Sequence, residues 1–211
     1  MSKEFDLDLA YEINGVEDAK RVYSDWAESY EGSLVDEMGY VAPRKIAEIY
    51  IENTADKSPV LDIGAGTGLL GQYLQDLTVD AIDITPAMLD IARGKGIYRD
   101  LIIGDLTKRL SIDDETYGGI VSCGTFTHGH VGPECFPELL RITKPGSLFC
   151  CGTIYPVFDG LGFGSALANL VSRGKISPVN FSEIDIYEKG DHAHAEDKGI
   201  VMIFRKLVNI D

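Results

Sequence analysis

Short apolar runs alternate with amphipathic stretches along most of the chain, and this alternation predicts its elements. Runs of strand length lie at residues 59–63, 77–82, 101–103, 117–123 and 147–153. Apolar residues at helical spacing predict helices at 16–31, 39–53, 69–74, 86–94, 137–143 and 163–172. Strands that alternate with helices in this way predict a parallel sheet with right-handed crossovers.

The last part of the chain departs from this alternation. Two apolar runs, at 181–188 and 200–206, flank the polar loop 189–199 with no helix between them. Consecutive strands joined by a loop usually pair antiparallel. The whole pattern therefore predicts an α/β, Rossmann-like fold: a mostly parallel seven-stranded sheet with helices on both faces and an antiparallel C-terminal hairpin.

A glycine-rich turn follows the run that ends at Asp62 and leads into the predicted helix at 69–74. Glycines leave no side chain between the backbone and a ligand. A small molecule can therefore lie directly on the backbone of this turn, at Gly64, Ala65 and Gly66. A dinucleotide fingerprint wants a small residue where Leu69 stands, and a Walker loop needs a lysine that this turn lacks. Residues 62–68 resemble instead the first signature of class I S-adenosylmethionine-dependent methyltransferases.

Aspartates stand at or just after the ends of three predicted parallel strands, where open α/β sheets bind ligands. Each suits a nucleoside that carries a sulfonium. Asp83 accepts both hydrogens of a ribose diol, because Thr85 is the predicted cap of the next helix and leaves Asp83 free. Asp105 accepts a hydrogen bond from the adenine amino group, although an ordinary turn acid explains it equally well. Asp62 orients the glycine turn or reaches the ligand's ammonium through water.

Neighbouring residues complete the predicted pocket. Ile84 and Met88 offer apolar surface to the adenine ring, although simple core packing also explains Met88. The backbone amide of Leu106 faces a ring nitrogen. A backbone carbonyl at Cys123, or at the glycine that follows it, accepts a hydrogen bond from the ammonium.

Further segments extend the resemblance to small-molecule-type class I methyltransferases; they are residues 79–89, 104–106, 139–146 and the aromatic segment 23–30. Over about residues 20–155 the chain resembles the methyltransferase-like proteins of the Williams–Beuren syndrome chromosome region. The resemblance implies S-adenosylmethionine as cofactor. It places Tyr30 in a lid over the methionine end, where an aromatic face attracts the sulfonium, and Trp26 either joins this lid or seals the helix against the sheet. The resemblance also implies a single domain with two parts, an N-terminal helical lid at residues 1–55 and a Rossmann-like methyltransferase core at residues 56–211.

Charge and composition narrow the predicted partners. The 211 residues carry 34 acidic and 19 basic side chains, a formal net charge of −15, which repels nucleic-acid backbones. Residues 122–125 also lack the Asn/Asp-Pro-Pro-Tyr/Phe box of base N-methyltransferases. We therefore predict a small-molecule acceptor and no nucleic-acid partner. No apolar run reaches spanning length, no signal-peptide core begins the chain, and the four cysteines form no Cys-x-x-Cys, so we predict a cytoplasmic protein without a membrane partner.

Methyl transfer from a sulfonium needs alignment and exclusion of water more than proton transfer. If the acceptor must lose a proton, His128 is the predicted base, with His130 in reserve; a solvated loop is the alternative for both. His192 and His194 are too few ligands for zinc, so we predict no metal. The aromatic, glycine-rich residues 158–163 either line the acceptor pocket or form a flexible connection.

Two other functions stay open. A sensor or partner protein would keep the cofactor pocket without catalysis. A nicotinamide-dependent oxidoreductase would use the same sheet, but Leu69 and the antiparallel tail count against it.

Overall fold

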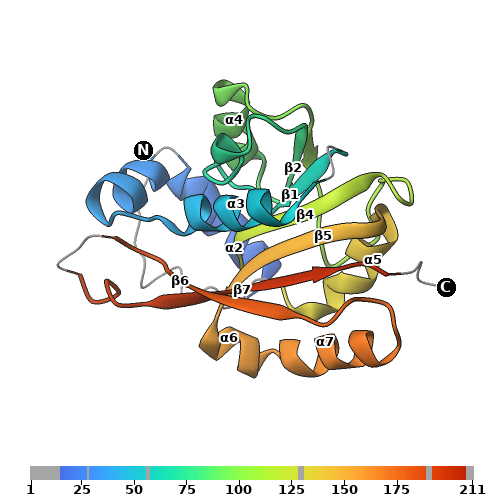
Figure 1. The fold of residues 1–211 in the computed structure, drawn as a ribbon. Helices are drawn as coiled ribbons and strands as arrows, with labels where there is room; N and C mark the ends of the chain where they lie inside the picture. Colours follow the sequence, from blue (N-terminus) through green and yellow to red (C-terminus); the bar gives the residue numbers. More distant parts are fainter. Residues whose placement is uncertain (1–14, 28, 56–57, 128–130, 189–191, 208–211) are drawn as a thin grey trace.

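The computed structural model describes residues 15–27, 29–55, 58–127, 131–188 and 192–207, and a seven-stranded sheet forms its centre (Figure 1). In chain order its strands are β1 (Val60–Ile63), β2 (Val79–Asp83), β3 (Leu101–Ile103), β4 (Tyr117–Phe126), β5 (Thr143–Ile154), β6 (Asn180–Asp185) and β7 (Lys198–Arg205). Their spatial order is β3-β2-β1-β4-β5-β7-β6. Strands β1 to β5 pair in parallel, and β7 pairs antiparallel with both β5 and β6. The predicted sheet with its antiparallel C-terminal hairpin is confirmed.

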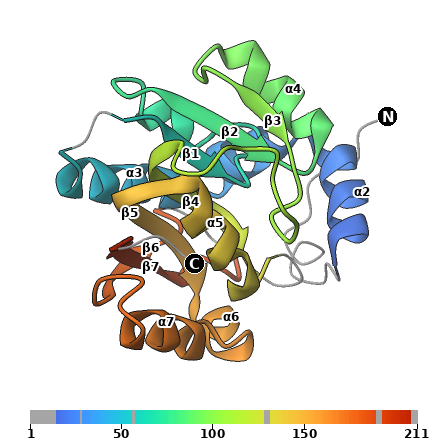
Figure 2. The same cartoon turned by 90° about the vertical axis from the view of Figure 1, so that its right-hand side faces the viewer.

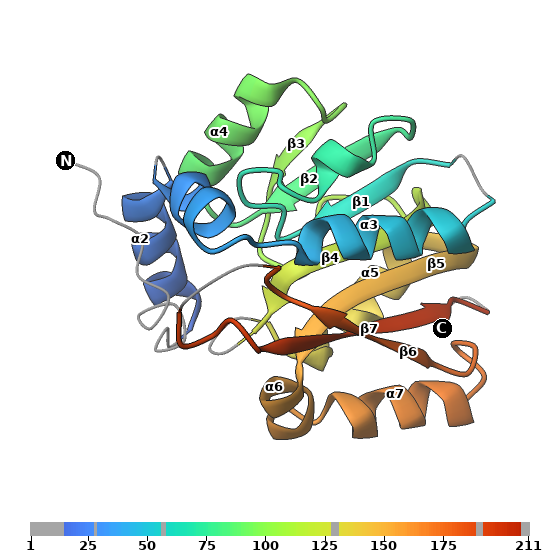
Figure 3. The same cartoon turned by 60° about the vertical axis from the view of Figure 1, so that its left-hand side comes forward.

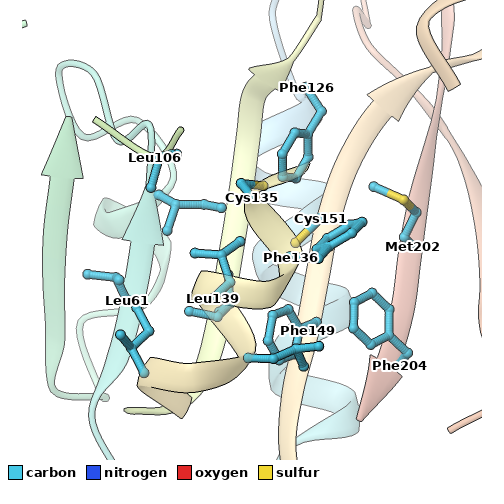
Figure 4. Packing of buried hydrophobic residues seen from close by; sticks show 14 of the residues in the cluster. Leu61, Leu106, Phe126, Cys135, Phe136, Leu139, Phe149, Cys151, Met202 and Phe204 are labelled. Atoms are coloured by element: carbon cyan, nitrogen blue, oxygen red, sulfur yellow. The ribbon is translucent and has the colours of Figure 1, made fainter. Parts of the chain in front are cut away.

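Helices cover both faces of the sheet (Figures 2 and 3). α3 (Ala42–Asn53) crosses one face, where its Ile46 and Tyr50 pack against apolar residues of the central strands. On the other face lie α5 (Phe136–Ile142), α6 (Tyr155–Gly160) and α7 (Phe163–Ser172). Successive strand residues point to opposite faces, so Val60 packs with α3 while Leu61 packs with α5. Figure 4 shows α5 contributing Phe136 and Leu139 to the core on its face.

The helices around β2 and β3 frame the carboxyl ends of the strands. α4 (Pro86–Lys95) begins with Pro86 in its first turn and ends at Gly96, whose φ of 64° is left-handed. α2 (Val16–Trp26) packs beside α4, and an ion pair between Glu31 and Lys95 joins the segment after α2 to α4. This arrangement brings the N-terminal segment to the end of the sheet where a ligand is expected.

Two predicted helices differ from the structure. The helix expected at 69–74 is wrong: the chain makes turns and one 3-10 turn, η2 (Gly71–Tyr73), before β2. Only a short stretch separates the glycine turn from β2, and the ring of Tyr98 packs on Gly68 and Gly71, where a helix with larger residues would stand. The helix expected at 16–31 ends at Trp26, because the backbone N–H and the hydroxyl of Ser29 both donate to the Trp26 carbonyl.

The remaining elements follow the predictions closely. A six-residue π-helix, η1 (Gly32–Glu37), and a 3-10 turn, η3 (Pro133–Cys135), connect the larger elements; neither of these, nor α6, was predicted. Strands β4 and β5 extend beyond the apolar runs at 117–123 and 147–153. Within the described ranges, every helix is too short or too polar to cross a membrane.

Candidate functional site

The turn after β1 exposes bare backbone at the carboxyl end of the sheet. Gly64 has a φ of 61°, and Thr125 of β4 packs so closely that a Cβ on Gly64 would lie 2.2 Å from Thr125 Oγ1. Gly66 has a φ of 55°, but nothing lies within 4 Å of the position that a Cβ would take there. The left-handed backbone disfavours a side chain at Gly66, while the space beside it is open to a ligand.

Asp83 joins this turn to the end of β2. Its Oδ2 accepts a hydrogen bond from Gly66 N at 2.8 Å, and its Oδ1 accepts one from Thr85 N at 2.8 Å. Burial raises the pKa of the Asp83 carboxyl, and these backbone hydrogen bonds partly offset the rise. Thr85 is the N-cap residue of α4, as predicted, but its side chain makes no capping hydrogen bond. Asp83 serves both the turn and the helix start.

Asp83 also lines a cavity with about 770 Å³ of empty space, part of it open to solvent. We call it the first cavity. It brings together residues that lie far apart in the sequence but were predicted to share one pocket. Those predicted residues are Tyr30, Gly64, Gly66, Asp83, Ile84, Met88, Asp105, Leu106 and Cys123.

Asp105 reaches the first cavity from the loop after β3. Its Oδ1 accepts hydrogen bonds from Thr107 N at 2.9 Å and Thr107 Oγ1 at 2.6 Å, and its Oδ2 pairs with Lys108 Nζ at 2.9 Å. Burial raises the pKa of the Asp105 carboxyl, but these partners lower it more, and the net direction is downward. Asp105 is therefore a turn acid that also presents a carboxylate to the cavity.

Asp62 lines a different space from the other two acids. It lines a smaller hollow under the glycine turn together with Tyr30, Ala65, Thr67 and Cys123. Its carboxylate is 1% exposed, and the side chain of Tyr98 donates a 2.6 Å hydrogen bond to its Oδ2. Burial raises the pKa of Asp62 to about 7 despite this hydrogen bond.

The same hollow holds an unpaired polar atom. Thr67 Oγ1 is buried and has no hydrogen-bond partner among the described residues. A buried hydroxyl without a partner is costly. A ligand that carries carboxylate or ammonium groups into this hollow would supply the missing partner.

Tyr30 and Cys123 stand where the cavities meet, because both line the first cavity, the hollow beside Asp62 and a second cavity. Tyr23 packs edge-on against Trp26 and Tyr30, with ring centroids 5.8 and 5.9 Å apart. Trp26 is 1% exposed and lines none of these spaces, which agrees with a sealing role. Burial raises the pKa of Tyr30 well above its usual value and that of Cys123 to about 12.

The second cavity opens beyond Tyr30 and Cys123, between the N-terminal segment and the hairpin side of the sheet. It has about 760 Å³ of empty space, part of it open to solvent. It shares Tyr23, Tyr30, Cys123 and Gly124 with the first cavity, so the two spaces adjoin. Two adjoining cavities with a common wall could hold a cofactor and an acceptor side by side.

Several predicted residues lie elsewhere. The segment 158–163 lines neither cavity: Phe158 stacks on Phe163 and meets the edge of Phe181. His128 and His130 lie outside the described residues, although the preceding Thr127 lines the second cavity.

The two described histidines of the hairpin loop contact residues close to them in the sequence. His194 Nδ1 lies 2.9 Å from Asp197 Oδ2, and the ring of His192 packs edge-on against Tyr187. In the part of the chain that the structure describes, no three potential ligands gather around a metal position.

Sequence reasoning missed three residues at the site, which are Tyr40, Thr67 and Tyr98. Tyr40 lies 3.1 Å from Cys123 Sγ through its hydroxyl, in a segment predicted to be helical. Thr67 was passed over as part of the glycine pattern. Tyr98 follows α4 in a loop without a motif. The only sequence signal for Tyr98 is Gly71, whose missing side chain leaves room for a large ring.

Comparison with known proteins agrees with this geometry. A family model described as a methyltransferase domain matches residues 61–151. The strand order and the antiparallel hairpin are those of the class I S-adenosylmethionine-dependent methyltransferase fold. Residues 61–151 are therefore similar to a methyltransferase domain, and they lie within that fold.

Individual relatives are similar over parts of the chain. The 18S rRNA (guanine-N(7))-methyltransferase of Bos taurus is 43% identical over 65 residues, which cover 30% of this chain and 23% of that protein. The demethylmenaquinone methyltransferase of Symbiobacterium thermophilum is 29% identical over 102 residues, 44% of this chain and 41% of that protein. The chain thus matches less than half the length of these curated relatives. A TehB-like methyltransferase structure from Corynebacterium glutamicum shares the fold, with a TM-score of 0.62 at 19% identity over 87% of this chain and 97% of that one.

Proposed function

We propose that this chain is a methyltransferase that takes the methyl group of S-adenosylmethionine and transfers it to a small-molecule acceptor. The observation that carries the proposal is the first cavity. There, the Asp83 and Asp105 carboxylates and the bare backbone of Gly66 face one space. The two carboxylates can accept hydrogen bonds from the hydroxyl and amino groups of an adenosine. Backbone without side chains suits a ligand that lies directly on it.

The surrounding residues fit the parts of this cofactor. Asp83 would hold the ribose diol, Ile84 and Met88 would pack against the adenine, and Asp105 with the amide of Leu106 would read its edge. The hollow lined by Asp62, Gly64, Ala65, Gly66 and Thr67 would take the amino-acid end, with a carbonyl at Cys123 beside it. Tyr30 would present its ring near the sulfonium. This assignment follows the likeness of residues 60–68, 79–89 and 104–106 to the signatures of small-molecule-type class I methyltransferases.

When bound, S-adenosylmethionine supplies a methyl carbon activated by a positive sulfur; the acceptor's lone pair takes that carbon while sulfur keeps the electrons of the broken bond. The protein aligns the two molecules and excludes water. Burial raises the pKa of Tyr30, Tyr40 and Cys123, so all three are protonated near neutral pH and do not serve as bases. His128 stays our proposed base for an acceptor that must lose a proton.

The small-molecule acceptor is the part of the proposal that the relatives leave open. By name, one relative methylates 18S rRNA and another demethylmenaquinone. A net charge of −15 favours the second kind of acceptor, because a polyanion must approach a protein of the same sign.

Calorimetry tests the cofactor, and labelled methyl transfer tests the reaction. We expect S-adenosylmethionine to bind and NAD to give no heat under the same conditions. Incubation with methyl-labelled S-adenosylmethionine and a small-metabolite extract should then give a labelled product. Binding of NAD alone would contradict the proposal, and binding without any labelled product from broad extracts would favour a sensor.

A further inference from the structure

We propose that the second cavity takes an uncharged, largely apolar small molecule as the methyl acceptor. The inference rests on the proposed function for its reaction, but the preference for an uncharged ligand follows from the cavity itself. The residues that line it come from the N-terminal segment, the ends of β4 and β5, and the β6–β7 hairpin.

The described lining carries no charged side chain. Its walls are aliphatic residues such as Ile46, Ile184 and Ile186, and aromatic rings such as Tyr40 and Tyr187. Its polar groups are hydroxyls, one thiol and backbone, and burial keeps the Tyr40 hydroxyl and the Cys123 thiol protonated by raising the pKa of each. A buried charge without a partner is costly, so a charged acceptor would lose its hydration here without gaining a counter-ion.

Two charged residues that neighbour lining residues in the sequence are paired with each other. Arg44 and Glu188 form an ion pair of 2.5 Å on the outer side of the wall, and neither lines the cavity. An anionic acceptor would also meet the net charge of −15. A cationic acceptor would have tyrosine rings but no carboxylate among the described lining residues, so the rings alone would have to replace its hydration.

The cavity is a built pocket rather than a gap between loosely placed segments. Val41 N donates to Ile186 O at 2.9 Å, and Glu188 N donates to Gly39 O at 2.9 Å, which joins the segment before α3 to the chain that leaves β6. The rings of Tyr40 and Tyr187 pack 5.7 Å apart at this joint. Tyr40 in turn contacts Cys123 Sγ at 3.1 Å, at the boundary with the first cavity.

Three indoles of similar size and different charge test the inference: neutral 3-methylindole, cationic tryptamine and anionic indole-3-acetate. Their binding is measured by calorimetry on the full chain saturated with S-adenosylhomocysteine. We expect 3-methylindole to bind at least roughly tenfold more tightly than either charged probe. Equal or tighter binding of tryptamine or indole-3-acetate, or no binding of 3-methylindole, would overturn the inference.

A charged substitution locates the bound probe. Ile186→Arg should abolish 3-methylindole binding, while Phe181→Arg, on the other face of the sheet at β6, should leave it unchanged. Thr127→Arg, at a half-buried position in the same wall, gives the same test if Ile186→Arg does not fold. Retention of the probe by a folded wall variant would contradict the proposed site.

Failure of the proposed function has a different signature. If S-adenosylhomocysteine gave no heat, the cofactor assignment would fail, while the three indoles could still be compared on the protein alone. If S-adenosylhomocysteine bound with equal affinity to the parent and the Ile186 variant but the charged indoles were preferred, only the acceptor inference would fail. Ile186 does not line the first cavity, which makes this separation possible.

Discussion

At the scale of single residues, the burial and raised pKa of Asp62 could not be predicted from the sequence. Its carboxyl is buried under the glycine turn with a pKa raised to about 7, and Tyr98 donates to it at 2.6 Å. A carboxyl whose pKa is raised in the folded state holds its proton longer than in the unfolded chain. Its effect on the free energy of unfolding is therefore favourable at low pH and is lost as pH rises towards about 7.

Tyr98→Phe should make this loss steeper. The tyrosine hydroxyl stabilises the ionised carboxylate, so its removal raises the pKa of Asp62 further and extends the loss above neutral pH. We expect the variant to lower the free energy of unfolding by about 1 kcal/mol near about pH 5 and by about 1.5–3 kcal/mol near about pH 8. Urea unfolding at the two pH values measures the difference.

The control for this prediction is Tyr73→Phe, because Tyr73 is 42% exposed. Its free energy of unfolding should stay within about 0.5 kcal/mol of the parent at both pH values. An equal loss at both pH values in Tyr98→Phe would mean that Asp62 does not depend on the hydroxyl.

Asp83→Ala should weaken cofactor binding by about 1.5–3 kcal/mol, because it removes a charged acceptor from the proposed ribose site. The structure adds a second effect. Gly66 N and Thr85 N lose their acceptor, so the melting temperature should fall as well. Calorimetry with S-adenosylmethionine and a thermal melt measure the two effects separately. Asp90→Ala, at an exposed position on α4, should change neither, and parent-like affinity in Asp83→Ala would remove the ribose role.

Among the elements, the short stretch between the glycine turn and β2 depends on glycine for space. A Cβ on Gly71 would lie 2.4 Å from the ring of Tyr98, whereas a Cβ on Gly94 in α4 meets nothing within 4 Å. Gly71→Ala should therefore lower the free energy of unfolding by about 1–3 kcal/mol through overpacking. Gly94→Ala should raise it by about 0.5–1 kcal/mol, because alanine favours the helix. Urea unfolding distinguishes the two directions, and equal effects would show that Tyr98 moves aside freely.

Elements with a complete local pattern could be predicted from the sequence, and those decided by distant contacts could not. β3 and α7 lie at the predicted residues because an apolar run or a helical stripe fixes each. The helix expected at 69–74 has the same kind of stripe, but Tyr98 occupies the space beside Gly71. The first cavity follows from the strand ends, since parallel strands bring Asp83 and Asp105 to one edge. The second cavity depends on backbone pairing between residues 39–41 and 186–188, which no local pattern marks.

On the scale of the whole molecule, charge decides which acceptors can approach. The chain has 34 acidic and only 19 basic side chains. Many of the basic side chains form ion pairs with acids within the described chain; they include Arg44, Lys95, Arg99, Arg141 and Lys198. Nucleic-acid binding needs several free cations on one face, because each neutralised phosphate adds affinity by releasing counterions.

We therefore expect an RNA hairpin to bind with a Kd weaker than about 100 µM even at about 50 mM salt, where electrostatic attraction is strongest. Fluorescence anisotropy of a labelled hairpin measures this, and binding of S-adenosylmethionine by the same sample shows that the protein is folded. Micromolar binding that weakens steeply with added salt would reveal a basic surface on the chain and would favour an RNA acceptor. A weak, salt-insensitive signal fits the expectation, because repulsion between like charges leaves no counterions to release.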